Sequence, residues 1–174
     1  MSALVARAAA EKLLQRLGIT SAPIDVENIA KALGLRVVYE DLGPDVSALL
    51  VTTGAKAAIG IHKHHSRTRQ RFSLAHEIAH FVLKHQFVPG EHVHVDSGRL
   101  ISARSASASA GLDPKEVEAN QFAAELLMPA RFIRLHATRF GKGSLLEHEV
   151  AELAQHFDVS QQAMTIRLST LRLA

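Results

Sequence analysis

The chain has 174 residues, of which 47% are hydrophobic and 21% charged, a composition typical of one globular domain with a buried core. It contains no cysteine, which excludes disulfide scaffolds, zinc ribbons and thiol catalysis. A net charge of +3 is too weak to indicate nucleic-acid binding by itself. The 11 histidines, set against one tyrosine and no tryptophan, favour metal or acid–base chemistry instead.

The amino-terminal segment shows no targeting signal. Charged residues interrupt it at Arg7, Glu11 and Lys12, so it does not resemble a signal peptide. No run of about 20 apolar residues follows that would span a membrane. We therefore expect a cytoplasmic protein without a membrane partner.

The segment 1–61 predicts two short helices followed by three strands. Apolar residues at helical spacing and closing glycines mark the helices, and Asp25 is the expected cap of the second. Runs of β-branched and apolar residues mark the strands, the last two of which are separated by Gly54 as in a hairpin. We expect helices at 3–17 and 25–34, and a small antiparallel sheet of strands at 35–40, 47–53 and 56–61.

The rest of the chain predicts further helices and one long loop. Asp113 is the expected cap, and Pro114 the first residue, of a helix that ends before Pro129. Small polar residues at 97–111 predict a loop, which could gate a site. The expected helices cover 67–85, 113–128 and 130–139, and two more lie within 144–173, divided near 158–160. We predict a main domain over 1–140 and a helical pair over 141–174 packed on it.

The central motif is His76-Glu77-Ile78-Ala79-His80, an H-E-x-x-H pattern. Residues four apart lie on one helix face, so both imidazoles can bind one ion while Glu77 stands beside it. The surrounding residues are apolar nearly all round, which predicts a buried helix. Buried histidines and a buried glutamate need partners, and one metal ion satisfies all three.

A third metal ligand must come from another segment, because a catalytic zinc ion usually takes three protein ligands and keeps one open position. The helix after Asp113 offers Glu116, Glu118 and Glu125. Glu116 shares a face with Asn120 and with small or apolar residues, which favours Glu116 as the ligand and Asn120 as a hydrogen-bond partner of the ligands. Glu118 lies about 200° round the helix and fits better as a solvated acid in the first turn.

Two segments resemble the signatures of the ImmA/IrrE family of zinc metallo-endopeptidases. The sequence RQRFSLAHEIAH at 69–80 looks like the signature helix of that family. The sequence EVEANQFAAELLMP at 116–129 looks like its second signature, E-x-E-A-N-x-F-A-A-x-L-L-M-P. The resemblance covers residues 5–130 and, more weakly, the tail. It implies an α+β, zincin-like fold, in which a small sheet packs on the buried H-E-x-x-H helix.

The same resemblance implies roles for the residues of both motifs. His76, His80 and Glu116 would bind Zn²⁺ as a gluzincin-like ligand set, in agreement with the helix-face argument. Glu77 would be the general base, taking a proton from water and passing it to the leaving amine. Sites made of two histidines and a carboxylate accept other divalent ions as well, so the residues alone do not identify the metal.

Weaker signals involve histidines outside the motif. The family often has Asn where His62 stands, so no role is carried over to that position. His92 and His94 alternate in an extended stretch, which fits surface histidines better than a second metal site. His94 and Arg104 are the candidates, by position only, for stabilising the oxyanion.

The segment 149–168 resembles a helix-turn-helix, with Ser160 as the expected cap of its second helix. DNA binding would place Gln161, Gln162 and Arg167 outward, but this helix carries few cations for phosphate contacts. A helical pair packed on the catalytic domain is therefore the favoured interpretation, and DNA is a disfavoured partner.

The sequence thus predicts a cytoplasmic zinc-dependent endopeptidase. The resemblance implies that its substrate is a regulatory protein, such as a helix-turn-helix transcriptional repressor or an antitoxin-like regulator, in stress or transcription control. The alternative is a regulatory module that binds DNA or a repressor and whose zinc site is not catalytic.

Overall fold

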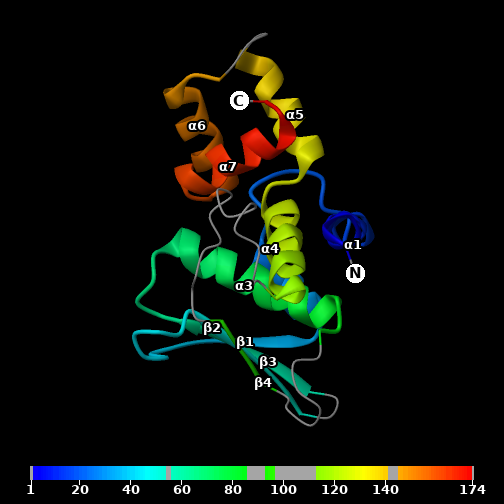
Figure 1. Cartoon of the computed structure of the whole chain (residues 1–174), viewed down its shortest axis with the longest axis vertical. Coiled ribbons are helices and arrows are strands. Elements are labelled where there is room, and N and C mark those ends of the chain that lie inside the picture. The colour runs from blue at the N-terminus through cyan, green and yellow to red at the C-terminus, as the bar shows by residue number, and fades with distance from the viewer. Residues whose placement is uncertain (1, 54–55, 86–92, 97–112, 141–144, 174) are drawn as a thin grey trace.

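The computed structural model describes the chain except residues 1, 54–55, 86–92, 97–112, 141–144 and 174 (Figure 1). The loop expected at 97–111 therefore lies outside the described residues. The described helices are α1 (Ala3–Arg16), α2 (Val26–Ala32), α3 (Arg67–Val82), α4 (Pro114–Leu127), α5 (Ala130–Ala137), α6 (Glu147–Phe157) and α7 (Gln161–Leu171), with a 3₁₀ turn at Thr138–Phe140. The described strands are β1 (Leu35–Glu40), β2 (Ala48–Thr53), β3 (Lys56–His62) and β4 (Val93–Asp96).

The sheet is mixed, with the strand order β1-β3-β2-β4. The expected hairpin of β2 and β3 is antiparallel, but β1 runs parallel to β3, so the expectation of a purely antiparallel sheet is wrong in this detail. The physical reason is that β3 lies between β1 and β2. The chain reverses direction twice between β1 and β3, and these two strands therefore run the same way.

A fourth strand, β4, extends the sheet beyond the three that the sequence predicts. It is only four residues long and pairs antiparallel with β2, which places His94 opposite Leu50. The alternation of His92 and His94 predicts an extended stretch here, but no local pattern shows that so short a stretch pairs with β2. This strand matters because it brings a histidine from the middle of the chain to the edge of the sheet.

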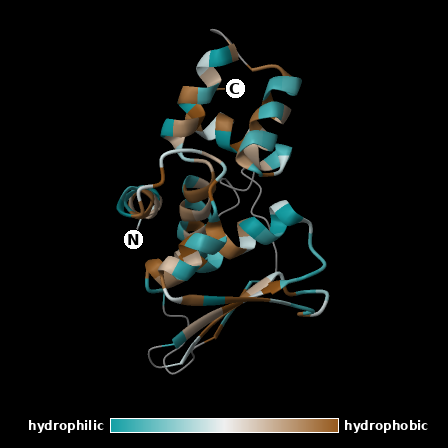
Figure 2. Ribbon diagram, turned by 180° about the vertical axis from the view of Figure 1, so that it is seen from behind, coloured by the Kyte–Doolittle hydropathy of each residue, from teal (hydrophilic) through white to brown (hydrophobic). Residues whose placement is uncertain are grey.

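Helix α3 is the central element of the molecule. Figure 1 shows it between the sheet and α4, and its residues 73–80 are all buried. This position explains why its sequence is apolar nearly all round, since both of its sides are covered. The other helices alternate brown and teal segments in Figure 2, as expected for helices that bury one side. The H-E-x-x-H motif is therefore inside the protein rather than on a solvated helix.

The carboxy-terminal helices lie at the end of the molecule opposite the sheet (Figure 1). Ser160 caps α7 by accepting a hydrogen bond from the backbone N–H of Ala163, as predicted. Arg67 on α3 binds both carboxylate oxygens of Asp158, in the turn between α6 and α7. Arg167 on α7 binds the Glu125 carboxylate on α4. These contacts join the pair to the rest of the fold, while a domain boundary at residue 140 stays a prediction.

Candidate metal centre

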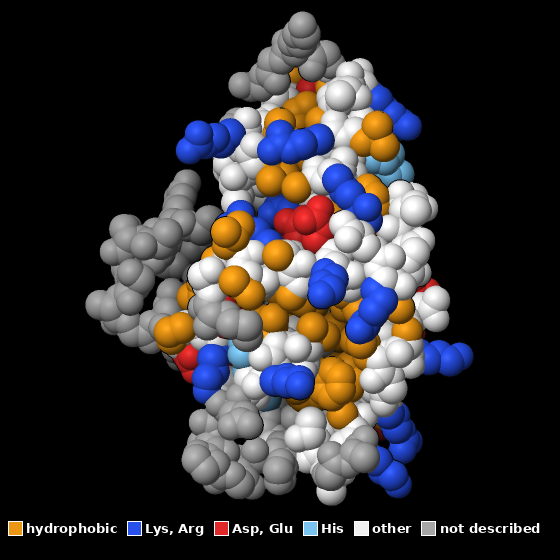
Figure 3. All heavy atoms as spheres, turned by 90° about the vertical axis from the view of Figure 1, so that its right-hand side faces the viewer, with side chains coloured by type: hydrophobic (Ala, Val, Ile, Leu, Met, Phe, Trp, Pro, Cys, Tyr) orange, Lys and Arg blue, Asp and Glu red, His pale blue; other side chains and the backbone are white. Residues whose placement is uncertain are grey.

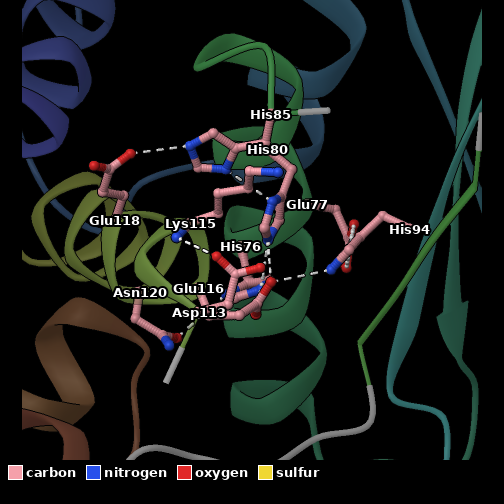
Figure 4. A network of polar contacts seen from close by, with 10 residues as sticks. All are labelled: His76, Glu77, His80, His85, His94, Asp113, Lys115, Glu116, Glu118 and Asn120. Atoms are coloured by element: carbon pink, nitrogen blue, oxygen red, sulfur yellow. Dashed lines mark hydrogen bonds and ion pairs between the residues drawn. The ribbon is translucent and has the colours of Figure 1, made fainter. Parts of the chain in front are cut away.

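Two histidines of α3 point to one spot beside the first turn of α4 (Figure 4). His76 and His80 are buried, and their Nε2 atoms lie 2.9 Å apart. They come together because they are one helical turn apart on the same face, as their spacing predicts. Glu77, the next residue along the helix from His76, is fully buried and faces His94.

Helix α4 supplies a carboxylate to the same spot. Asp113 caps this helix by accepting a hydrogen bond from the backbone N–H of Lys115, and Pro114 occupies its first position, both as predicted. The Glu116 carboxylate, in the first turn, lies 3.2 Å from Nε2 of His76 and 3.4 Å from Nε2 of His80. Of the three glutamates that the sequence offers, Glu116 is the one that faces both histidines.

Asn120 lies one turn after Glu116 and reaches the other side of His76. Its Oδ1 atom is 3.2 Å from Nδ1 of His76. Since an amide oxygen can only accept, Nδ1 carries the proton in this contact, and in the neutral ring Nε2 keeps its lone pair. That lone pair faces Glu116 and His80, where an ion would be bound.

His94 is the fourth residue of the cluster. It is 8% exposed, so its interpretation as a surface histidine is wrong, while its naming as an oxyanion candidate rested on its position in the sequence alone. Its Nδ1 lies 2.9 Å from Glu77 Oε2, and its Nε2 lies 3.2 Å from Glu116 Oε1. The only sequence signal was the alternation Val93-His94-Val95, which puts one histidine side chain on one face of a short strand. The companion His92 and the other oxyanion candidate, Arg104, lie outside the described residues.

The donor set fits a divalent metal ion. Ligand atoms of His76, His80, His94 and Glu116 all lie within 4.8 Å of one another. Imidazole and carboxylate are ligands that zinc and related ions accept. Because a zinc–nitrogen bond is about 2.0–2.1 Å long, two nitrogens 2.9 Å apart can share one ion.

Burial and neighbouring groups shift the pKa values of His80, Glu77 and Glu116. Burial, followed by the neighbouring His76 and His94, lowers the pKa of His80 to about 2, so its imidazole is neutral. Burial raises the pKa of Glu77 and makes its carboxylate a stronger base. Burial opposes ionisation of Glu116 too, but hydrogen bonds to His76 and His94 outweigh it and lower the pKa.

The pKa of His94 is shifted in the opposite direction to that of His80. Burial disfavours its charged form, but hydrogen bonds to Glu116 and Glu77 outweigh this and raise its pKa to about 9. At neutral pH it is therefore an imidazolium that donates to both carboxylates. A proton donor thus stands beside the predicted base.

The two glutamates of α4 that do not face the cluster are nevertheless buried. The interpretation of Glu118 as a solvated acid is wrong, since it is 4% exposed and its Oε2 lies 3.2 Å from Nε2 of His85. Glu125 binds Arg167 and accepts a hydrogen bond from the backbone N–H of Ala130. Helical spacing placed Glu118 away from Glu116 correctly, but it could not show that His85, after the end of α3, reaches that side. His62 is also buried, at the end of β3.

Comparisons with known proteins agree with this architecture. The family model described as the IrrE N-terminal-like domain, a peptidase family, matches residues 30–169. A solved structure described as a Mycobacterium tuberculosis transcriptional regulator superposes with a TM-score of 0.60 at 21% identity, which shows a shared fold. The alignment covers 94% of this chain and 46% of that protein, so this chain spans less than half its length. No curated protein matches the sequence.

Proposed function

The chain belongs to the IrrE N-terminal-like family of peptidases, and from this membership we propose that it is a zinc-dependent endopeptidase that cleaves a regulatory protein. One observation carries the proposal. On the buried helix α3, two imidazoles converge with the Glu116 carboxylate while Glu77 stands immediately beside them. This is the arrangement that metal-assisted hydrolysis of an amide bond requires.

Three residues of this chain would hold the metal: His76, His80 and Glu116. A zinc ion bound by them would polarise the scissile carbonyl and lower the pKa of water to about 7. Asn120 would support this set by keeping the Nδ1 proton of His76 on the outer side of the ring. The ligands come from two helices that pack directly on each other.

Glu77 and His94 would carry the proton transfers. Glu77 accepts a proton from the attacking water and delivers it to the leaving amine, and its raised pKa suits both steps. His94 donates a hydrogen bond from Nδ1 to Glu77 and so orients the base. As an imidazolium, it can also donate to the oxygen on which negative charge develops.

The proposed substrate is a transcriptional repressor or an antitoxin-like regulator in the cytoplasm, as part of transcription control or a stress response. Family membership supports a protein substrate. The similar structure is described as a transcriptional regulator, which associates this fold with regulation in that protein. No described helix has both the length and the apolar character needed to cross a bilayer.

The rival proposal, a module that binds DNA, has less support. Gln161 and Gln162 are exposed, but Arg167 is 2% exposed and binds Glu125 and the backbone oxygen of Met128. The cation that a DNA-reading helix would need is therefore used inside the protein. Figure 3 shows Lys and Arg side chains spread along one face and interleaved with hydrophobic atoms. That distribution gives no support to a continuous phosphate-binding strip on this face.

The proposal is tested by E77Q, which keeps the shape of the side chain but cannot accept the proton. Zinc-loaded wild type and E77Q are each incubated with purified helix-turn-helix repressors, and new protein amino termini are mapped by mass spectrometry. We expect E77Q to bind one zinc ion and to cleave about 10²–10⁴-fold more slowly. E147Q, at the exposed start of α6, is the matched control and should cleave like wild type. Cleavage that is unchanged in E77Q would exclude this mechanism.

A further inference from the structure

A buried chain of polar side chains extends from His80 on the side away from the metal centre (Figure 4). Nδ1 of His80 lies 3.0 Å from Nδ1 of His85, and Nε2 of His85 lies 3.2 Å from Glu118 Oε2. The side chains are 0%, 4% and 5% exposed, respectively. Neither His85 nor Glu118 contributes to the group of residues that could hold the ion.

The backbone at the end of α3 brings His85 back over His80. Lys84 adopts a left-handed conformation with φ of 54°, and the backbone N–H of His85 donates to the backbone oxygen of His80 at 3.0 Å. This closure of the helix end is a common way to satisfy its last carbonyls. Here it also folds the His85 ring against the ring of His80, with their centroids 5.0 Å apart.

Helix α4 supplies the carboxylate of this chain from its second glutamate. Glu116 and Glu118 are two residues apart and therefore point to different sides of α4. Glu116 faces the ion-binding side of His80, and Glu118 reaches its outer side through His85. Two residues in one turn of α4 thus lie on opposite sides of the His80 ring: Glu116 near Nε2, and Glu118 linked to Nδ1 through His85.

The hydrogen atoms in this chain follow from what each group can donate or accept. An ionised carboxylate only accepts, so Nε2 of His85 carries a proton and donates it to Glu118. A neutral imidazole has one donor and one acceptor, so Nδ1 of His85 must accept from Nδ1–H of His80. The Nε2 lone pair of His80 is then directed at the metal centre.

We propose that His85 and Glu118 are positioning residues that fix His80 in the tautomer able to bind the metal ion. This inference rests on the proposed function, because it assigns them to the same zinc centre. Asn120 contacts Nδ1 of His76 directly, whereas Nδ1 of His80 contacts His85, which in turn contacts Glu118. In both cases the outer partner holds the proton on Nδ1. Such outer partners hold the ring orientation of a ligand histidine and increase its basicity.

The test uses two variants that interrupt the chain of hydrogen bonds at different points. H85F removes the acceptor for His80. E118L removes the acceptor for His85 and puts an apolar side chain of similar size in its place. Zinc affinity is measured by competition with a chelator, and the His80 tautomer is read from ring ¹⁵N shifts in the metal-free protein. We expect zinc to bind about 10–100-fold more weakly in both variants, with His80 no longer held as the Nδ1–H tautomer.

Two further variants separate positioning from general stability. E118Q keeps an acceptor oxygen for His85, so it should recover most of the affinity that E118L loses. E125Q changes another buried carboxyl group on α4, the one that binds Arg167, and should keep the zinc affinity of wild type even if it unfolds at a lower temperature. A loss of affinity in E125Q equal to that in E118L would mean that the effect is only structural, and would overturn the inference.

The outcomes also distinguish this inference from the proposed function. Wild-type zinc affinity and an unchanged His80 tautomer in folded H85F and E118L would overturn the inference and leave the peptidase proposal standing. Failure of wild type to bind zinc would instead refute the zinc centre. The ¹⁵N shifts of the metal-free protein would even then decide whether His85 and Glu118 set the tautomer of His80.

Discussion

The imidazoles of the candidate centre differ in what binds their second nitrogen. His76 and His80 each have Nδ1 bound to a partner on the outer side, while Nε2 faces the other histidine and Glu116. His94 instead has both nitrogens bound to carboxylates, Glu77 and Glu116. The first two rings therefore suit the proposed role of metal ligands, whereas His94 suits the proposed role of a proton donor between two acids.

This difference predicts that H94A separates metal binding from catalysis. The variant should bind one zinc ion as wild type does, because the three proposed ligands remain. It should cleave peptide bonds about 10²–10³-fold more slowly, since Glu77 loses its orienting partner and the oxyanion loses a donor. Metal content measured by elemental analysis, together with kcat on a cleaved repressor, checks this. Loss of zinc in folded H94A would mean that His94 is itself a ligand.

At the residue scale, the sequence predicted those members of the site whose positions depend on one helix. The spacing of His76 and His80, and the face shared by Glu116 and Asn120, follow from 3.6 residues per turn. His94 could not be placed, because its position depends on how a four-residue strand registers with β2. The pairing of His85 with Glu118 depends on packing between two helices, which no local pattern specifies.

At the element scale, one ion-pair cluster connects α3 to the turn between α6 and α7. Arg67 donates from Nε and Nη2 to Asp158 at 2.9 and 2.8 Å, and Arg71 lies 3.2 Å from the same carboxylate. Arg71 also donates to the backbone oxygens of Asp158 and Ile24. Asp158 itself ends α6 in a left-handed conformation with φ of 53°. The first turns of α3, the helix that carries H-E-x-x-H, are thus linked by ion pairs to the turn between α6 and α7.

The cluster predicts a loss of stability in acid. The hydrogen bonds from Arg67, followed by the charge of Arg71, outweigh partial burial and lower the pKa of Asp158 below its usual value of 3.8. A lowered folded-state pKa stabilises the fold above the unfolded-state pKa, and this contribution is lost as pH falls through the folded-state pKa. At pH 7, D158N should reduce the free energy of unfolding by about 1 kcal/mol. The difference from wild type should shrink below about pH 4.

Urea unfolding of wild type and D158N from pH 7 to pH 2 measures this effect. D45N, which changes an exposed aspartate before β2, is the control and should remain close to wild type. A D158N deficit that stays constant down to pH 2 would show that ionisation of Asp158 is not its source.

The elements themselves were predicted more completely than their pairing. Caps at Asp25, Asp113 and Ser160 are local signals, and each accepts the expected backbone hydrogen bond. The parallel pairing of β1 with β3 is not local, because it depends on which strand lies in the middle of the sheet. The burial of Arg167 likewise depends on its distant partner Glu125, and it removes the cation on which a DNA-binding interpretation of α7 relied.

At the scale of the whole molecule, the candidate centre lies where three layers are stacked. The sheet contributes His94, α3 contributes the H-E-x-x-H motif, and α4 contributes Glu116 (Figure 1). The two helices hold the proposed metal ligands, and the sheet adds the histidine that contacts Glu77 and Glu116. Because the proposed ligands converge only in the folded chain, metal binding should stabilise the fold as well as supply chemistry.

The proposed function requires that His76, His80 and Glu116 together hold one zinc ion beside Glu77. A crystal structure of the zinc-loaded protein, with anomalous data collected at the zinc absorption edge, tests it most directly. We expect one anomalous peak per chain, about 2.0–2.2 Å from both Nε2 atoms and from a Glu116 oxygen, with Glu77 close by but not bound to the ion. A peak located elsewhere, or no peak between these residues in fully loaded protein, would contradict it.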